Sequence, residues 1–136
     1  MGGWDLCIRD RSSLNRLSEE IAGRPALIDL WASWCGPCRR LSESMIPVWE
    51  EFAPKGFTIV GVAREYRTAD KAVKAIEADG YRWLNLLELD DAGHIWDLYR
   101  VSNAAGGTFL VDPDGTIVAV SPTAEEVRAY LTEFFK

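Results

Sequence analysis

The stretch ALIDLWASWCGPCRR, residues 26–40, places two cysteines just after a short apolar run. The apolar run has the length and composition of a buried strand. Gly36 and Pro37 follow the first cysteine, and proline suits the first turn of a helix because its missing N–H is not needed there. The stretch therefore predicts a strand, a tight connection and a helix that begins near Gly36, with Cys35 at or just before its first residue.

The beginning of a helix favours negative charge, because its first N–H groups have no partner within the helix. A thiol at such a position has a lowered pKa, and the thiolate is the reactive form. Cys35 precedes the helix, so we expect it to be the more exposed cysteine and to attack an external disulfide. Cys38 shares the inward stripe of the helix with Leu41 and Met45, so we expect it to resolve the mixed disulfide from within.

Asp29 interrupts the apolar strand that precedes the cysteines. A carboxylate without a partner is unfavourable in a buried strand, and burial raises its pKa. We expect such a group to take a proton from Cys38 when that thiol must attack, and to return it later. The alternative is a strand covered on one face only, with Asp29 in solvent.

Elsewhere, short apolar runs alternate with segments of helical spacing, and Asp112-Pro113-Asp114-Gly115 is a strong turn sequence. The expected strands are residues 4–8, 26–31, 57–63 and 83–89, followed by a hairpin over residues 108–120. The expected helices are residues 14–22, one long helix from 36 to 52 that bends at Pro47, a helix capped by Thr68 that ends at Gly80, short turns at 95–99, and a last helix with a Thr123/Glu126 capping box.

This order predicts an α/β fold with a central mixed sheet, helices on both faces, and a C-terminal β-hairpin followed by a helix. The length of 136 residues suits a single domain over residues 1–136. A formal net charge of −6 argues against nucleic-acid or anionic-membrane partners. No apolar run approaches the ~20 residues of a membrane span, and no signal peptide is recognisable.

The segment DLWASWCGPCRR, residues 29–40, resembles the active-site segment of thioredoxin-fold proteins, whose signature is WCGPC. The stretches GFTIVGVAREYR and TFLVDPDGTIVAV extend the resemblance to the TlpA/ResA type of thiol–disulfide oxidoreductase, over about residues 5–135. The resemblance implies a thioredoxin-like fold with a redox-active Cys35–Cys38 disulfide. It makes Cys35 the nucleophile, Cys38 the resolving thiol and Asp29 the buried carboxylate.

The same resemblance implies that Trp34 borders the substrate surface. It also places Glu65 near a position where relatives carry an acidic residue beside the dithiol, as a possible proton relay. The family has a cis-proline before the TFL strand, and Ala105-Gly106-Gly107 replaces it here. A cis bond without proline costs about 2.5–4 kcal/mol, so we expect a trans peptide.

Gly106 has no Cβ, so its backbone can approach the cysteines closely. The residues expected to contact substrate are Trp34, Gly36, Pro37, Ala105, Gly106 and Gly107.

The sequence thus predicts a monomeric enzyme that reduces protein disulfides and is itself reduced by an upstream thiol reductant, without a metal or organic cofactor. The Gly-Pro dipeptide between the cysteines resembles that of reducing thioredoxins, at about −270 mV. Relatives of this type work outside the cytoplasmic membrane, so we expect a periplasmic or cell-envelope location, with the export signal absent from this chain. A cytoplasmic location is the alternative.

Other functions of the cysteine pair stay open. A metal site needs about four ligands, and only Cys7 and His94 could join the pair, neither within motif spacing; Cys7 is expected to be a small buried residue of a strand. Two chains could instead share a metal or an iron–sulfur cluster through Cys35 and Cys38. A peroxidase is less consistent with Ala32, because peroxiredoxin-type sites carry threonine at that position.

Overall fold

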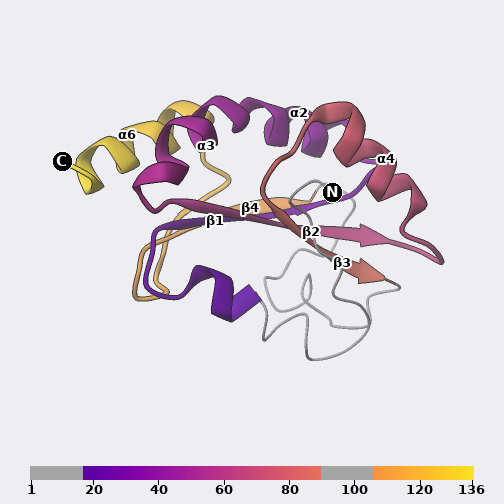
Figure 1. Cartoon of the computed structure of the whole chain (residues 1–136), viewed down its shortest axis with the longest axis horizontal. Coiled ribbons are helices and arrows are strands. Elements are labelled where there is room, and N and C mark those ends of the chain that lie inside the picture. Colours follow the sequence, from indigo (N-terminus) through magenta and orange to yellow (C-terminus); the bar gives the residue numbers. More distant parts are fainter. Residues whose placement is uncertain (1–16, 90–105) are drawn as a thin grey trace.

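The structure is a computed structural model that describes residues 17–89 and 106–136. Its strands form one mixed sheet in the order β3-β2-β1-β4-β5 (Figure 1). The bounds are Ala26–Trp31 for β1, Thr58–Glu65 for β2, Leu84–Leu89 for β3, Gly107–Val111 for β4 and Ile117–Val120 for β5. β1, β2 and β3 run parallel, whereas β4 pairs antiparallel with both β1 and β5. The expected mixed sheet and C-terminal hairpin are therefore confirmed.

The labelled helices pack on one face of this sheet, and a short helical segment ending at residue 21 lies on the other (Figure 1). Their bounds are Gly36–Ser44 for α2, Ile46–Phe52 for α3, Asp70–Asp79 for α4 and Ala124–Phe134 for α6, with a 3₁₀ turn at Ala53–Lys55. Helices on both faces agree with the predicted fold class.

β1 is the central strand, and all six of its residues are buried. Its side chains alternate between two cores, with Leu27 and Trp31 facing the labelled helices and Ile28 and Leu30 facing the other side. Asp29 falls between Leu27 and Trp31 in this alternation, so its side chain is directed toward α2. The strand pattern itself therefore places a carboxylate under the helix that carries the cysteines.

The single bent helix expected over residues 36–52 is wrong, because the structure has two helices that meet at Met45. Pro47 lies in the first turn of α3 and has no N–H to donate to the carbonyl of Glu43. The N–H of Met45 instead donates to the carbonyl of Ser42 at 3.1 Å, which tightens the end of α2. Proline therefore ends one helix and begins the next instead of bending a continuous one.

The N-terminal cap of α6 is the predicted one, whereas the N-terminal cap of α4 differs from the prediction. The capping box of α6 is present, with hydrogen bonds of 2.8 Å from Thr123 N to Glu126 Oε1 and 3.1 Å from Glu126 N to Thr123 Oγ1. The cap of α4 is Ala69 and not Thr68 as expected. Thr68 Oγ1 still accepts a hydrogen bond of 3.3 Å from the N–H of Asp70, so its side chain supports the helix from one residue further out.

Several expected features fall on residues that the structure does not describe. They are the strand around Cys7, the turns at 95–99, His94 and Ala105. Within the described ranges, no helix combines the length and the apolar character that a bilayer span requires.

A buried hydrogen bond fixes the strand end that leads into the cysteine loop. The indole Nε1 of Trp31 donates to Asn85 Oδ1 on β3 at 2.8 Å. The intervening strand β2 carries Gly61 next to Asn85, and a Cβ on Gly61 would lie 1.9 Å from Asn85 Oδ1 and 3.1 Å from Trp31 Nε1. This position therefore requires glycine, because any larger side chain would displace the hydrogen bond.

We predict that Gly61→Ala lowers the free energy of unfolding by about 1–3 kcal/mol, the usual cost of overpacking a core. Urea unfolding of the disulfide form, followed by circular dichroism, measures this loss. Gly36→Ala is the control, since its Cβ would meet only the flexible end of Arg40, at 3.3 Å. Equal stability of the two variants would show that the Trp31–Asn85 bond tolerates the methyl group.

Candidate active site at the start of helix α2

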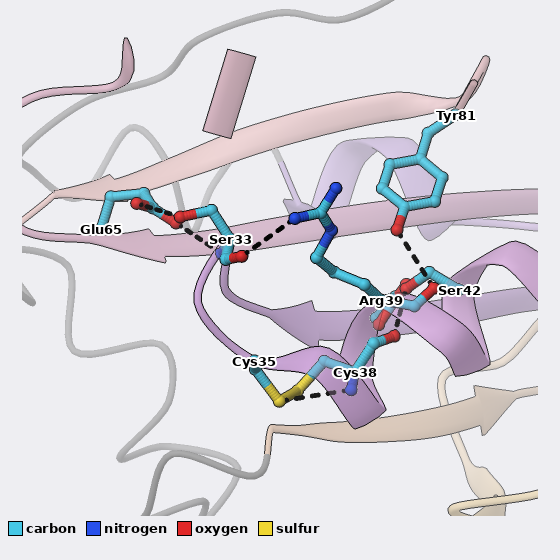
Figure 2. Close-up of a disulfide and its surroundings, with 8 residues drawn as sticks. Ser33, Cys35, Cys38, Arg39, Ser42, Glu65 and Tyr81 are labelled. Carbon is cyan, nitrogen blue, oxygen red and sulfur yellow. Dashed lines mark hydrogen bonds between the residues drawn. A yellow bond between two sulfur atoms is a disulfide. The ribbon is translucent and has the colours of Figure 1, made fainter. Parts of the chain in front are cut away.

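Cys35 and Cys38 are joined by a disulfide, with an S–S distance of 2.12 Å and a Cα–Cα distance of 5.3 Å (Figure 2). Cys35 is the N-cap of α2, and its sulfur accepts a hydrogen bond of 3.2 Å from the N–H of Cys38. The structure thus confirms the predicted placement of the pair at the beginning of a helix. The same N–H would face negative charge on this sulfur in the reduced form.

The expected difference in exposure between the two cysteines is wrong for the disulfide form, in which both are 6% exposed. The covalent bond draws both side chains against the first turn of α2, so Cys35 is no more open than Cys38. Their surroundings still differ, because the sulfur of Cys38 lies next to the backbone of Gly106. Trp34, Gly36 and Pro37 are exposed beside the pair, and their contact with substrate stays a prediction.

Asp29 is buried, at 2% exposure, which excludes the alternative of a solvent-facing carboxylate. Burial raises the pKa of Asp29 to about 7, and the hydrogen bond from Ser42 partly offsets this increase. Ser42 Oγ donates to Asp29 Oδ2 at 2.5 Å and lies 3.0 Å from the carbonyl oxygen of Cys38. One serine therefore links the carboxylate to the helix turn that carries the second cysteine.

A cavity of about 250 Å³ connects this carboxylate with the dithiol. Asp29, Cys38, Gly106 and Thr108 all line it. Thr108 lies directly opposite Asp29 in the β1–β4 pairing, so the two side chains share a face of the sheet. Its hydroxyl oxygen is buried without a hydrogen-bond partner in the described part of the chain. The cavity therefore has a polar wall next to Cys38.

Gly106 belongs to the Ala105-Gly106-Gly107 stretch that leads into β4. Its φ is +67°, and a Cβ there would lie 2.8 Å from the sulfur of Cys38 and 2.3 Å from the carbonyl oxygen of Leu30. The predicted close approach of this glycine to the cysteines is therefore confirmed. Gly107 begins β4 beside it, while Ala105 lies outside the described residues.

Glu65 anchors the loop that precedes the cysteines. Its carboxylate is 3% exposed and accepts two hydrogen bonds of 2.8 Å from Ser33, one from the backbone N–H and one from the hydroxyl. Figure 2 shows Glu65 and Arg39 on opposite sides of Ser33, with Arg39 Nη1 donating to the carbonyl of Ser33 at 3.3 Å. These contacts hold the loop in place, and a proton-relay role for Glu65 stays a prediction.

Arg39 also connects α2 with the end of α4. Its Nε and Nη2 donate to the two carboxylate oxygens of Asp79 at 2.7 and 2.8 Å. The hydroxyl of Tyr81 donates to the same carboxylate at 2.8 Å. The hydrogen bond from Arg39 is the main cause of the lowered pKa of Asp79.

The sequence interpretation did not find Ser33, Ser42, Arg39 or Thr108. Of these, Ser42 left a signal, since it is a polar residue four positions after Cys38 on the inward stripe of the helix. The others act through contacts between distant segments. In the described ranges, no three His, Cys, Asp or Glu side chains come together in a way that could hold a metal ion.

We predict that Gly106→Ala destabilises the protein more than a glycine replacement that causes backbone strain alone. Gly80→Ala is the matched control, because its φ is +81° and nothing lies within 4 Å of its Cβ position. Left-handed backbone costs an alanine about 1–2 kcal/mol, and the contact with Cys38 should add about 1–3 kcal/mol at residue 106. Urea unfolding gives both values, and equal losses would contradict the tight contact.

We predict that Asp29→Asn stabilises the protein, and that the gain grows with pH. The carboxyl ionises near 3.8 in the unfolded chain and near 7 in the folded one. Between these values the unfolded chain has released a proton that the folded protein retains, so rising pH removes stability from the native protein. Asp29→Asn has no carboxyl to titrate, so it does not lose this stability. The difference in free energy of unfolding between the variant and the parent protein should level off above pH 7.

Urea unfolding at pH 4, 5.5, 7 and 8 tests this prediction. Asp79→Asn is the control, and its effect on stability should have the opposite sign. The lowered pKa of Asp79 means that its ionised form stabilises the fold at higher pH and that this contribution is lost as pH falls. Asp79→Asn should therefore destabilise the protein most at higher pH. A difference between Asp29→Asn and the parent protein that does not change with pH would show that the buried carboxyl titrates normally.

Known proteins are similar to this chain in sequence. The model of the AhpC/TSA family matches residues 10–120. The thiol-disulfide oxidoreductase ResA of Oceanobacillus iheyensis is 25% identical over 117 residues, covering 84% of this chain and 59% of ResA. The thiol:disulfide interchange protein DsbE of Tatumella citrea is 35% identical over 103 residues, covering 71% of this chain and 49% of DsbE. The chain thus spans about half to three fifths of the length of these relatives.

Solved structures agree with the sequence comparison. The thioredoxin domain of a thiol-disulfide oxidoreductase from Bacteroides vulgatus has a TM-score of 0.75 and 30% identity, covering 87% of this chain and 84% of that chain. A thiol:disulfide interchange protein from Bacteroides sp. has a TM-score of 0.76 and 29% identity, with coverage of 88% and 77%. The chain therefore belongs to the AhpC/TSA family, and it shares the thioredoxin-like fold of these solved thiol–disulfide oxidoreductases.

Proposed function

We propose that this chain reduces protein disulfides by cycling between the Cys35–Cys38 disulfide and the free dithiol. The observation that carries the proposal is the joint placement of three groups. One sulfur lies at the start of α2, and the other lines a cavity that also contains a buried carboxylate. This arrangement supplies a nucleophile, a resolving thiol and a proton acceptor for it.

The first step uses the reduced enzyme. The thiolate of Cys35 attacks one sulfur of the substrate disulfide, so that a Cys35–substrate bond forms while the substrate S–S bond breaks. The departing substrate sulfur leaves as a thiolate and takes a proton from solvent. Before the attack, the N–H of Cys38, which points at the sulfur of Cys35, stabilises the negative charge of the nucleophile.

The second step releases the product. Asp29 takes the proton of the Cys38 thiol through the shared cavity, and the resulting thiolate attacks the sulfur of Cys35. The enzyme disulfide forms, the mixed disulfide breaks, and the substrate leaves with its second thiolate, which is then protonated. With a pKa of about 7, Asp29 can both accept and return a proton near neutral pH.

An upstream thiol reductant then returns the enzyme to the dithiol form. Both electrons reside in the cysteine sulfurs, so no cofactor enters the scheme. The likeness to ResA and DsbE supports a periplasmic or cell-envelope location, and the Gly-Pro dipeptide supports net reduction. We further propose that the chain acts as a monomer and that residues 1–136 form a single domain.

We predict that Cys38→Ser accumulates a stable mixed disulfide on Cys35 when the reduced variant is mixed with insulin. The serine hydroxyl cannot resolve the intermediate, so the adduct persists. Mass spectrometry after alkylation identifies the cysteine that carries it, and Cys35→Ser is the control that should form none.

Asp29→Asn in the otherwise native protein should slow product release roughly 10²-fold at pH 7, as the loss of a general base does.

Four results would contradict the proposal. An adduct on Cys7 would overturn the assignment of the nucleophile, and an equilibrium potential near about −120 mV against glutathione would reverse the proposed direction. Cluster absorption bands in protein purified without oxidant, or turnover with hydrogen peroxide and none with insulin, would favour the metal-binding or peroxidase alternatives.

A further inference from the structure

A second hollow, of about 440 Å³, lies beside the cysteine loop and is not used by the proposed chemistry. The loop contributes Ser33 and Trp34, and α4 contributes Lys71 and Lys74. Trp34 is 46% exposed and immediately precedes Cys35, so the hollow begins one residue from the proposed nucleophile. A segment bound at this cysteine would therefore extend over or past the hollow.

The charge of this hollow is opposite to that of the whole chain. Lys71 and Lys74 are exposed, lie one turn apart on α4, and form no ion pair with any residue in the described ranges. The third cation, Arg39, is paired with Asp79 through both carboxylate oxygens. Among the described residues, the hollow therefore presents two lysines without an ion-pair partner, on a chain whose formal net charge is −6.

The shape of the hollow follows from small side chains. Ala75 and Ala78 are the other α4 residues that line it, and their short side chains leave the space open. The half-exposed indole of Trp34 also lines it. The lining thus offers a bound group both an aromatic ring and two ammonium groups, which suits a carboxylate on a short aliphatic stem.

We propose that this hollow binds an acidic side chain of the protein substrate, a few residues from the substrate cysteine that pairs with Cys35. An extended segment advances about 3.3 Å per residue, which sets this short separation. The inference rests on the proposed function and names the substrate class of the same site. The net charge of the enzyme repels acidic proteins, so the two lysines would also orient such a substrate as it approaches.

The test compares three disulfide peptides that are identical except for the residues near the cysteine. These residues are Glu in the first peptide, Gln in the second and Lys in the third. We expect kcat/KM for the Glu peptide to exceed that for the Gln peptide roughly three- to tenfold at low salt, since an exposed charge pair contributes about 1.5- to 5-fold. The Lys peptide should be slowest. The advantage of the Glu peptide should shrink as salt screens the charges.

Lys71→Gln/Lys74→Gln should reduce the Glu-to-Gln ratio to about one. The matched control is Lys55→Gln/Lys136→Gln, which removes the same charge from residues outside the hollow and should keep the ratio. An unchanged ratio in the first variant, or an equal loss in the control, would overturn the inference. The inference would also be overturned if kcat/KM for oxidised glutathione exceeded that for the Gln peptide as much as the Glu peptide does, and if Lys71→Gln/Lys74→Gln removed this advantage. The hollow would then serve a small disulfide.

Binding without exchange separates this inference from the proposed function. The same peptides with serine in place of cysteine are titrated into isotope-labelled protein, and NMR follows the Trp34 indole and the α4 amides. We expect shifts at both with the Glu peptide and weaker ones with the Lys peptide. Shifts with the Glu peptide, together with no disulfide exchange by the cysteine peptides, would support binding in the hollow and contradict the proposed function. Disulfide exchange without shifts at Trp34 and α4 would support the proposed function and contradict binding in the hollow.

Discussion

The hydrogen bond between Asp29 and Ser42 is the contact on which the site depends, because it joins the central strand to the helix that carries the cysteines. The 2.5 Å bond lies in the core, where burial removes a carboxylate from the bulk water that would stabilise its charge. The protein therefore holds Asp29 with a raised pKa, at a cost in stability near neutral pH. In return for this loss of stability, a proton acceptor lines the same cavity as Cys38.

Three other contacts hold the cysteine loop around this pair. Glu65 binds Ser33 ahead of the disulfide, and Gly106, just before β4, packs against the sulfur of Cys38. The Arg39–Asp79 pair ties the same helix to α4, which brings the lysines of α4 beside Trp34. The features that fix the dithiol thus also create the hollow in which we expect the substrate to be recognised.

Local chemistry made much of the fold predictable. The apolar run of β1, the Asp112–Gly115 turn and the Thr123 capping box follow from neighbouring residues, and each is present. The break at Met45 was not predicted, although Pro47 was recognised, because a missing N–H can either bend a helix or end it. The α4 cap shifted by one residue for a similar reason, since several turn geometries can satisfy the same N–H group.

The sequence by itself determined the redox pair, because Cys35 and Cys38 are three residues apart at a helix start and their joining needs only local geometry. It also indicated that Asp29 is unusual, since a carboxylate in an apolar strand conflicts with burial. Only the tertiary structure decided what surrounds them. Ser42 meets Asp29 from α2, Ser33 meets Glu65 at the end of β2, and Thr108 lines the cavity from β4. Cys35 lost its expected extra exposure once the disulfide packed against α2. Such contacts depend on how distant segments pack, which spacing along the chain does not encode.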